Sequence, residues 1–98
     1  MTASGLALES VVVVAPDVLS SQLGSEQVML NLRDGTYYGL DDVGSEIWAL
    51  LQQPITIGEI CDAVVESYEV DVKRCRSDVV RLLDDLIRRG LVELRASR

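Results

Sequence analysis

The sequence contains no histidine and only two cysteines among its 98 residues. Histidine is the commonest general base and a frequent metal ligand, so its absence removes the usual means of catalysis and metal binding. No Cys-x-x-Cys pair, phosphate-binding glycine loop or nucleophile elbow is present. Two cysteines do not make a disulfide framework. Because Cys61 and Cys75 fall in amphipathic helical patterns, we expect two reduced core thiols. We therefore expect a protein that is not an enzyme and binds no metal or cofactor.

Long apolar runs are also missing. No stretch of eighteen or more apolar residues occurs, so the sequence predicts no membrane span. The first five residues lack the basic region of a secretory signal, which favours a cytoplasmic location. The length of 98 residues, 48% of them hydrophobic, suits a single domain over residues 1–98 with one modest core. Residues 1–10 show no pattern and are expected to form a loose arm.

Basic residues are scarce in the first two thirds of the chain. Residues 1–70 carry eleven acidic side chains and one basic side chain, Arg33, whereas residues 71–98 carry eight basic and five acidic ones. The whole chain has a net charge of −7. Since phosphate contacts supply most of the affinity for nucleic acids, an acidic body of this kind argues against nucleic acid as a partner.

The segments before residue 41 predict a small antiparallel sheet. Residues 11–14 (VVVV) are β-branched and form a strand or an extended arm, and residues 18–23 are a weakly patterned strand. Apolar residues alternate over 28–32, as in a half-buried strand. The Arg-Asp-Gly sequence at 33–35 predicts a hairpin turn, after which residues 36–40 return as the third strand of a meander.

The remainder of the chain predicts three helices. The first begins at Asp41 or Asp42 and runs to about Gln52, and the second opens at a Thr56-x-x-Glu59 capping box. The third runs from about residue 71 to 89 and ends at Gly90, with a short terminal strand or extended tail after it. A three-stranded antiparallel sheet followed by three helices is an α+β fold compatible with a winged helix-turn-helix arrangement.

The apolar face of the third helix spans a wider arc than packing against one core requires. On a wheel of about 100° per residue its apolar positions spread over roughly 160°, where one core face needs about 100°. Cys75 and Leu82 lie at the spare margin, beside a ridge formed by Asp71, Asp78 and Asp85. The pattern fits a partner surface, and it also fits an ordinary core helix with a solvated acidic flank.

The edge of the predicted meander is unguarded. Exposed strand edges usually carry charges or proline, which prevent unwanted pairing, but residues 36–39 (TYYG) carry neither. Such an edge next to a partly spare apolar helix suits the addition of a peptide strand. The alternative is that Tyr37 and Tyr38 only pack, and that the N-terminal arm covers the edge.

Several motifs resemble a known family. Residues 35–51 (GTYYGLDDVGSEIWALL) resemble the strand-to-helix segment of PqqD-like proteins. The resemblance continues through residues 56–60 (TIGEI), 68–71 (YEVD) and 79–91 (VVRLLDDLIRRGL), and spans about residues 18–94 in all. Asp41 stands where many relatives carry asparagine, which we expect to affect only the helix cap.

The resemblance implies a recognition element for ribosomally synthesised, post-translationally modified peptides (RiPPs). In this family the leader segment of a precursor peptide adds as a strand to the third strand and lies against the third helix. The stand-alone length is similar to that of the leader-binding protein of split lasso-peptide systems, which implies a leader peptidase and a macrocyclase as partners. The residues expected to bind peptide are Thr36, Tyr37, Tyr38, Gly39, Asp71, Cys75, Asp78, Val79 and Leu82.

Three other functions fit the same architecture. A PqqD-type chaperone in a cofactor pathway would bind its own precursor and a radical enzyme. A winged-helix DNA-binding regulator has the same element order, but the acidic charge and the lack of basic residues around the turn between the second and third helices argue against it. A purely structural subunit is the remaining alternative.

Overall fold

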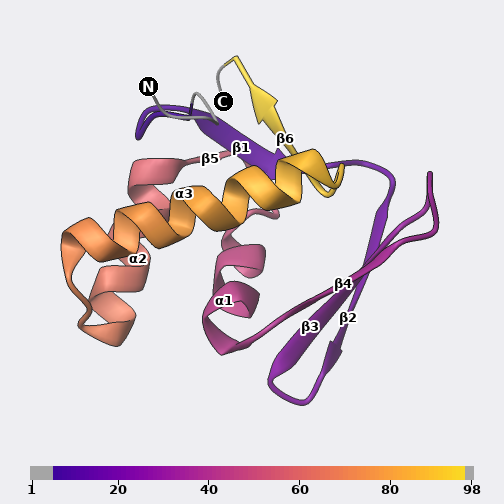
Figure 1. The fold of residues 1–98 in the computed structure, drawn as a ribbon, viewed down its shortest axis with the longest axis horizontal. Helices are drawn as coiled ribbons and strands as arrows, with labels where there is room; N and C mark the ends of the chain where they lie inside the picture. The colour runs from indigo at the N-terminus through magenta and orange to yellow at the C-terminus, as the bar shows by residue number, and fades with distance from the viewer. Residues whose placement is uncertain (1–5, 97–98) are drawn as a thin grey trace.

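Two small antiparallel sheets and three helices make up the chain in the computed structural model, which describes residues 6–96 (Figure 1). The predicted α+β class is confirmed. The elements are β1 (Val11–Val14), β2 (Val18–Leu23), β3 (Glu26–Asn31), β4 (Tyr37–Leu40), α1 (Asp42–Leu50), β5 (Ile55–Thr56), α2 (Ile57–Tyr68), α3 (Val72–Arg88) and β6 (Val92–Arg95). Within the described residues, no helix is both long and apolar enough to cross a membrane.

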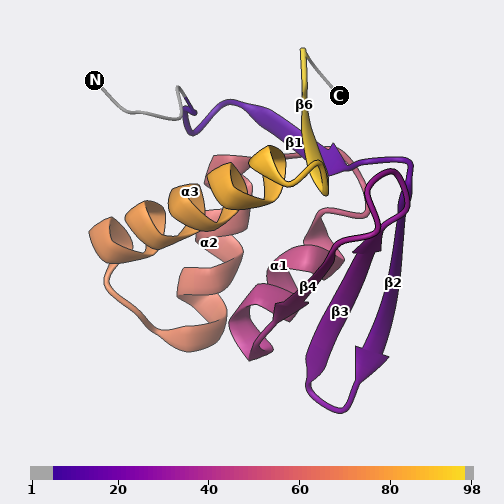
Figure 2. The same cartoon turned by 45° about the vertical axis from the view of Figure 1, so that its right-hand side comes forward.

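The predicted meander is present as the sheet β2-β3-β4. Its faces are set by the register, because side chains alternate along each strand. Met29 pairs with Tyr38 and is fully buried beneath the sheet. On the other face Leu30 pairs with Tyr37, whose side chain is 70% exposed. The meander packs beside α1, and its other face is open to solvent (Figure 2).

A second sheet, β5-β1-β6, was not expected. Strand β1 pairs on one side with β6, where Val14 lies opposite Val92, and on the other side with the two-residue strand β5. The prediction of one three-stranded sheet is therefore incomplete. Strands β1 and β6, far apart in sequence, thus lie side by side (Figures 1 and 2).

The expected loose arm is wrong for residues 6–10, whereas residues 1–5 lie outside the described part of the chain. Leu6 is buried in the core. The amide of Gly58 donates to the carbonyl of Leu8 at 2.8 Å, and the amide of Ile57 donates to that of Ser10 at 3.1 Å. These bonds use amides at the start of α2, which have no partner inside the helix. The arm therefore serves as part of the cap of α2.

The predicted starts of α1 and α2 are confirmed by their N-caps, and α1 ends at Leu50, two residues before the predicted Gln52. The Asp41 carboxylate accepts from the Gly44 amide at 2.9 Å and begins α1. The capping box of Thr56 and Glu59 begins α2. A Cβ on Gly44 would lie 2.9 Å from Cδ2 of Leu40, so only glycine lets the first turn of α1 close onto β4 without displacing that side chain.

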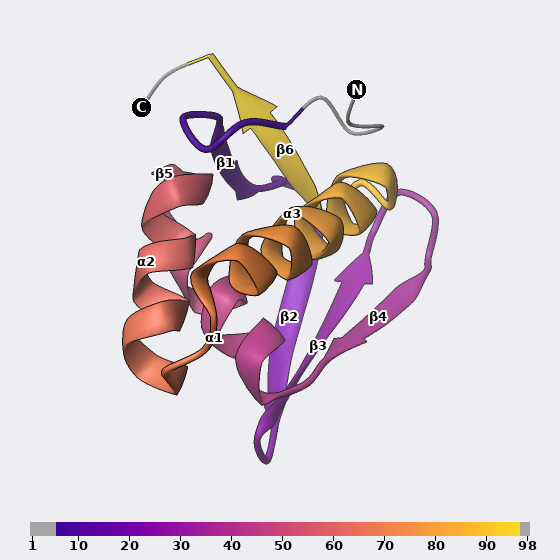
Figure 3. The same ribbon diagram turned by 60° about the vertical axis from the view of Figure 1, so that its left-hand side comes forward.

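The core lies between α1, α2, α3 and the inner faces of the two sheets (Figure 3). Cys61 and Cys75 are buried free thiols, as predicted. Burial raises the pKa of the Cys61 thiol to about 11, so both its charge and its reactivity are suppressed. Trp48 is 3% exposed in the middle of this core.

Asn31 attaches the meander to the end of α3. Its amide Nδ2 donates to the carbonyl of Arg89 at 2.8 Å, and its Oδ1 accepts from the Arg33 amide at 2.9 Å. Guanidinium Nη2 of Arg33 adds a bond to the carbonyl of Gly90 at 3.2 Å. These bonds satisfy carbonyls that a helix end leaves without partners, and they hold the β3–β4 turn against the C-terminus of α3.

Tyr38 makes a second attachment, from β4 itself. Its hydroxyl donates to Oδ2 of Asp85 at 2.6 Å, and the Arg89 guanidinium lies 4.7 Å from the centre of its ring. Nε of Arg89 also donates to the other oxygen of Asp85 at 3.2 Å. The Tyr38 hydroxyl thereby lowers the pKa of Asp85, and the carboxylate raises the pKa of Tyr38.

Replacing Trp48 with alanine should destabilise the fold by about 3–5 kcal/mol, because a large buried side chain leaves a cavity. A domain of this size has little more stability than that to lose. Among the described residues, nothing accepts a hydrogen bond from the indole Nε1. Trp48→Phe therefore loses no hydrogen bond and should cost much less. Urea denaturation of both variants checks this, and equal losses would contradict it.

Tyr38→Phe should destabilise the protein by about 1 kcal/mol at neutral pH, since it removes one partly exposed bond to a carboxylate. The pKa of Asp85 is lowered in the folded state, so its contribution is complete above the ordinary aspartate pKa and is lost as pH falls through the lower folded value. The difference between variant and wild type should therefore shrink in acid. Tyr37→Phe, on the exposed side chain next to it, is the control and should change nothing.

Candidate functional site

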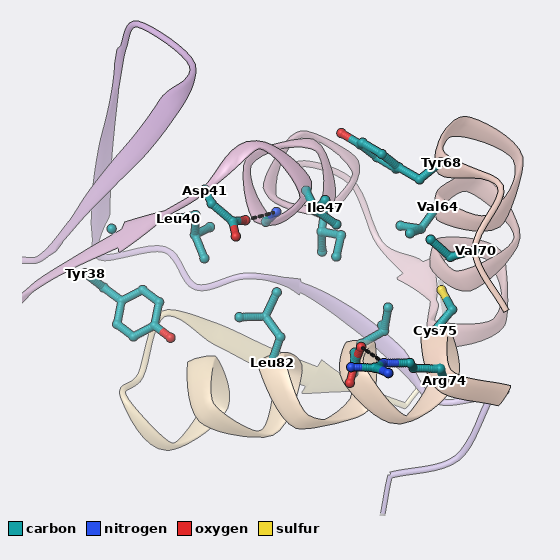
Figure 4. Close-up of a pocket in the computed structure, with 15 residues that line it drawn as sticks. Tyr38, Leu40, Asp41, Ile47, Val64, Tyr68, Val70, Arg74, Cys75 and Leu82 are labelled. Carbon is teal, nitrogen blue, oxygen red and sulfur yellow. Dashed lines mark hydrogen bonds and ion pairs between the residues drawn. The ribbon is translucent and has the colours of Figure 1, made fainter. Parts of the chain in front are cut away.

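A hollow of about 610 Å³ lies between β4, α1, α2 and α3. In Figure 4, α3 forms one side and α1 the other, with Tyr38 at one end and Tyr68 and Val70 at the opposite end. Most of its lining is aliphatic or thiol: Leu40, Val43, Ile47, Val64, Val70, Cys75, Val79 and Leu82. Such a hollow has the size and the chemistry to hold one or two apolar side chains.

The outer edge of β4 borders this hollow. The amide of Asn31 donates to the carbonyl of Thr36 at 2.9 Å, which fixes the phase of the antiparallel β3–β4 ladder. Backbone groups alternate in direction along such a strand, so those of Tyr38 point toward β3. Those of Tyr37 and Gly39 point outward. In the described part of the chain no strand pairs with this edge, because β4 is the last strand of its sheet.

Gly39 is not required by the fold. It lacks the left-handed conformation of Gly24, Gly35 and Gly90, and a Cβ placed on it would meet nothing within 4 Å. Glycine in a strand is usually unfavourable unless a backbone must approach closely. The position of Gly39 at the rim of the hollow therefore indicates that the backbone of another peptide could approach the edge of β4 closely there.

Six of the nine residues predicted to bind peptide line the hollow: Tyr38, Gly39, Cys75, Asp78, Val79 and Leu82. Three do not. Thr36 lies in the turn before β4, where its hydroxyl donates to Asp34 at 2.8 Å. The side chain of Tyr37 lies on the opposite face of the sheet, and Asp71 is the N-cap of α3.

The exposure of residues along α3 differs from the prediction that Cys75 and Leu82 both lie at a spare margin of its apolar face. Cys75 and Val79 are 4% and 3% exposed, so they form the floor of the hollow and belong to the core. The Cys75 thiol donates to the carbonyl of Cys61 at 3.8 Å, which holds it toward α2. Of the two residues assigned to the margin, Leu82 alone is partly exposed. Leu82 is therefore the residue of α3 whose change would alter the hollow with the least effect on the core.

Sequence reasoning missed the walls that α1 and α2 provide. Val43 and Ile47 of α1 and Val64 of α2 line the hollow, although no residue of these two helices was predicted to bind peptide. Tyr68 and Val70 sit where the second helix breaks, and they remain 38% and 42% exposed. Apolar side chains at a predicted break were a usable signal, because a break that only connects two helices is usually polar.

The carboxylates of the predicted acidic ridge have partners within the chain. Asp71 accepts from the Arg74 amide at 3.0 Å, and Asp78 lies 3.8 Å from Nε of Arg74. Asp85 is bound by Tyr38 and Arg89. Of the three carboxylates, Asp85 is the one held by both a hydroxyl and a guanidinium, so it is the least available to a ligand. Among residues 6–96, no group of three or more His, Cys, Asp or Glu side chains could hold a metal ion.

Comparisons with solved structures place the fold among peptide-recognition proteins. The structure resembles "TbiB1 in Complex with the TbiA(beta) Leader Peptide" with a TM-score of 0.78 and 38% identity, over 83% of this chain and 94% of that one. It also resembles "Lasso peptide synthetase B1 complexed with the leader peptide", with a TM-score of 0.75 and 22% identity, over 84% of this chain and 96% of that one.

A third similar structure is that of the PqqD part of Methylobacterium extorquens PqqCD, described as a functional and stand-alone RiPP recognition element. Its TM-score is 0.76 and its identity 18%, over 95% of this chain and 99% of that one. At that identity, as for the lasso peptide synthetase, the likeness concerns the fold alone. No curated protein matches the sequence.

The family model for coenzyme PQQ synthesis protein D (PqqD) matches residues 26–92, from the start of β3 to the start of β6. The matched region contains β4, α1, α2 and α3, the four elements that build the hollow. More than half of the chain is therefore covered by one family, and the predicted resemblance is confirmed. The chain belongs to the PqqD family.

Proposed function

We propose that this protein binds the leader segment of a ribosomally synthesised precursor peptide as an added strand on β4. It then presents the bound precursor to maturation enzymes, a leader peptidase and a macrocyclase, and itself makes and breaks no bonds. The observation that carries the proposal is the pair of outward backbone positions, Tyr37 and Gly39, on an unguarded edge beside an apolar hollow.

The edge and the hollow have separate tasks. Strand addition supplies backbone hydrogen bonds that any peptide can make, so selectivity must come from the side chains that leave the added strand. Tyr38, Val79 and Leu82 line the side of the hollow that such a strand would face. One or two apolar or aromatic leader residues would be buried there, at a gain of roughly 1.5–3 kcal/mol each.

The relative with 38% identity supports this proposal, because its structure is described as a complex with the TbiA(beta) leader peptide. A leader that is disordered in solution loses conformational entropy when it binds, which costs several kcal/mol. We therefore expect affinities from tens of nanomolar to micromolar.

The edge is tested by Gly39→Pro. Proline removes the outward N–H but leaves the pairing with β3, and edge strands tolerate it. The matched control is Ser20→Pro. The amide of Leu32 donates to the carbonyl of Asp17 at 2.9 Å, which fixes the β2–β3 ladder so that Ser20 faces outward on the opposite edge. By fluorescence anisotropy with labelled TbiA(beta) leader peptide, Gly39→Pro should bind at least tenfold more weakly, and Ser20→Pro should bind like wild type.

The hollow is tested by Leu82→Asp, with Leu19→Asp as its control on an exposed position of β2. We avoid Val79→Asp because Val79 is buried, so a loss of binding would be confused with unfolding. Leu82→Asp should abolish binding with the circular dichroism spectrum retained. Equal affinity for Leu82→Asp and wild type would refute the hollow as the anchor, and no binding by wild type would refute the proposed function.

A further inference from the structure

A second hollow, of about 480 Å³, adjoins the first along the C-terminal half of α3. The two hollows share Tyr38, Asp78 and Leu82, so the Tyr38 and Leu82 side chains stand between them. The second hollow has a different character, because charged residues replace the aliphatic ones. Its remaining lining is Arg81, Asp84, Asp85 and Arg88.

The carboxylates of the second hollow are engaged by cations of the same helix. Asp84 lies 3.0 Å from Nη2 of Arg88. Asp85 is bound by Arg89 at 3.2 Å and by the Tyr38 hydroxyl at 2.6 Å. Asp78, with a side chain that is 58% exposed, lies 3.8 Å from Arg74.

Arg81 is the exception. In the part of the chain that the structure describes, Arg81 takes part in none of the ion pairs, and its residue is exposed. Arg81 is therefore the guanidinium of this hollow that remains available to an acidic ligand group, although the chain as a whole has a net charge of −7.

We propose that Arg81 selects leader peptides that carry an acidic side chain close to their apolar anchor. The inference rests on the proposed leader binding. A strand added to β4 passes Tyr38, so one part of it faces the apolar hollow and the next part faces the charged one. Side chains on one face of a strand recur every second residue, about 7 Å apart. The acidic residue would therefore lie about two to four positions from the anchor.

The ridge of Asp71, Asp78 and Asp85, taken alone, would instead suggest polar or basic leader residues. A basic side chain in the second hollow would find Asp84 and Asp85 already paired, and it would be repelled by Arg81. The acidic body repels an acidic peptide only at long range. That repulsion is screened beyond about 8 Å at physiological salt. The short-range attraction by Arg81 therefore determines whether an acidic leader residue is favoured.

The test is a selection from a randomised peptide display library on the immobilised protein, in four forms. Wild type, Arg81→Ala and Arg81→Glu are compared with Arg76→Glu. Arg76 is the matched control, because it is exposed on the same helix, lines neither hollow, and undergoes the same charge reversal. Peptides selected by wild type and by Arg76→Glu should carry an apolar anchor with Asp or Glu two to four positions away.

The acidic enrichment should vanish with Arg81→Ala and become basic with Arg81→Glu. For one selected peptide, replacing the acidic residue with its amide should weaken binding to wild type about two- to five-fold, as for an exposed ion pair, and should not change binding to Arg81→Ala. Anchored peptides without acidic preference, or with the same preference in Arg81→Ala, would overturn this inference and leave leader binding intact. Selection of no peptide by any of the four proteins would overturn both.

Discussion

The bonds of Asn31 fix the relation between the strand edge and the helix on which the site depends. Asn31 is 3% exposed, and it is the one buried polar side chain in the core of the described residues. It joins the end of β3 to the carbonyl of Arg89, the C-cap of α3, so leaving it unpaired would cost more than its bonds gain. Two features require glycine at position 90. Its φ is +74°, which other residues rarely adopt, and a Cβ would come within 3.0 Å of Nδ2 of Asn31. Since β4 follows β3 through a tight turn, this contact also places the edge of β4 beside α3.

This attachment brings together the two surfaces of the candidate site, the backbone edge of β4 and the apolar hollow between the helices, which differ in chemistry. Backbone groups of Tyr37 and Gly39 face outward from β4, and a peptide of almost any sequence can pair with them. Apolar walls from three helices lie next to the edge. In the proposed complex they would accept particular side chains of the leader, so affinity and selectivity would be divided between main chain and side chains. Such a division suits a protein that must hold one precursor and leave its remaining residues accessible to enzymes.

Local patterns in the sequence predicted the elements whose formation depends on residues close to one another in the sequence. The meander, the three helices, their caps and the terminal strand follow from alternation, the capping box and glycine positions. The sheet β5-β1-β6 does not, because the pairing of Val11–Val14 with Val92–Arg95 joins segments from opposite ends of the chain. In the site, the edge and α3 were predicted, but the sequence did not predict which face of the sheet each tyrosine takes: the Tyr38 side chain faces the hollow and that of Tyr37 faces away from it, because successive side chains of a strand lie on opposite faces. The pairing of Asp85 with Tyr38 could not be predicted, because it depends on how β4 meets α3.

Hydrogen exchange of single backbone amides tests the central claim most directly, because strand addition affects alternate residues. In the free protein the amides of Tyr38 and Leu40 should exchange slowly, and those of Tyr37 and Gly39 rapidly. On addition of the TbiA(beta) leader peptide, Tyr37 and Gly39 should become protected, while Ser20, on the outer edge of β2, should stay unchanged. Binding that leaves Tyr37 and Gly39 unprotected, or that protects Ser20 instead, would contradict strand addition to β4.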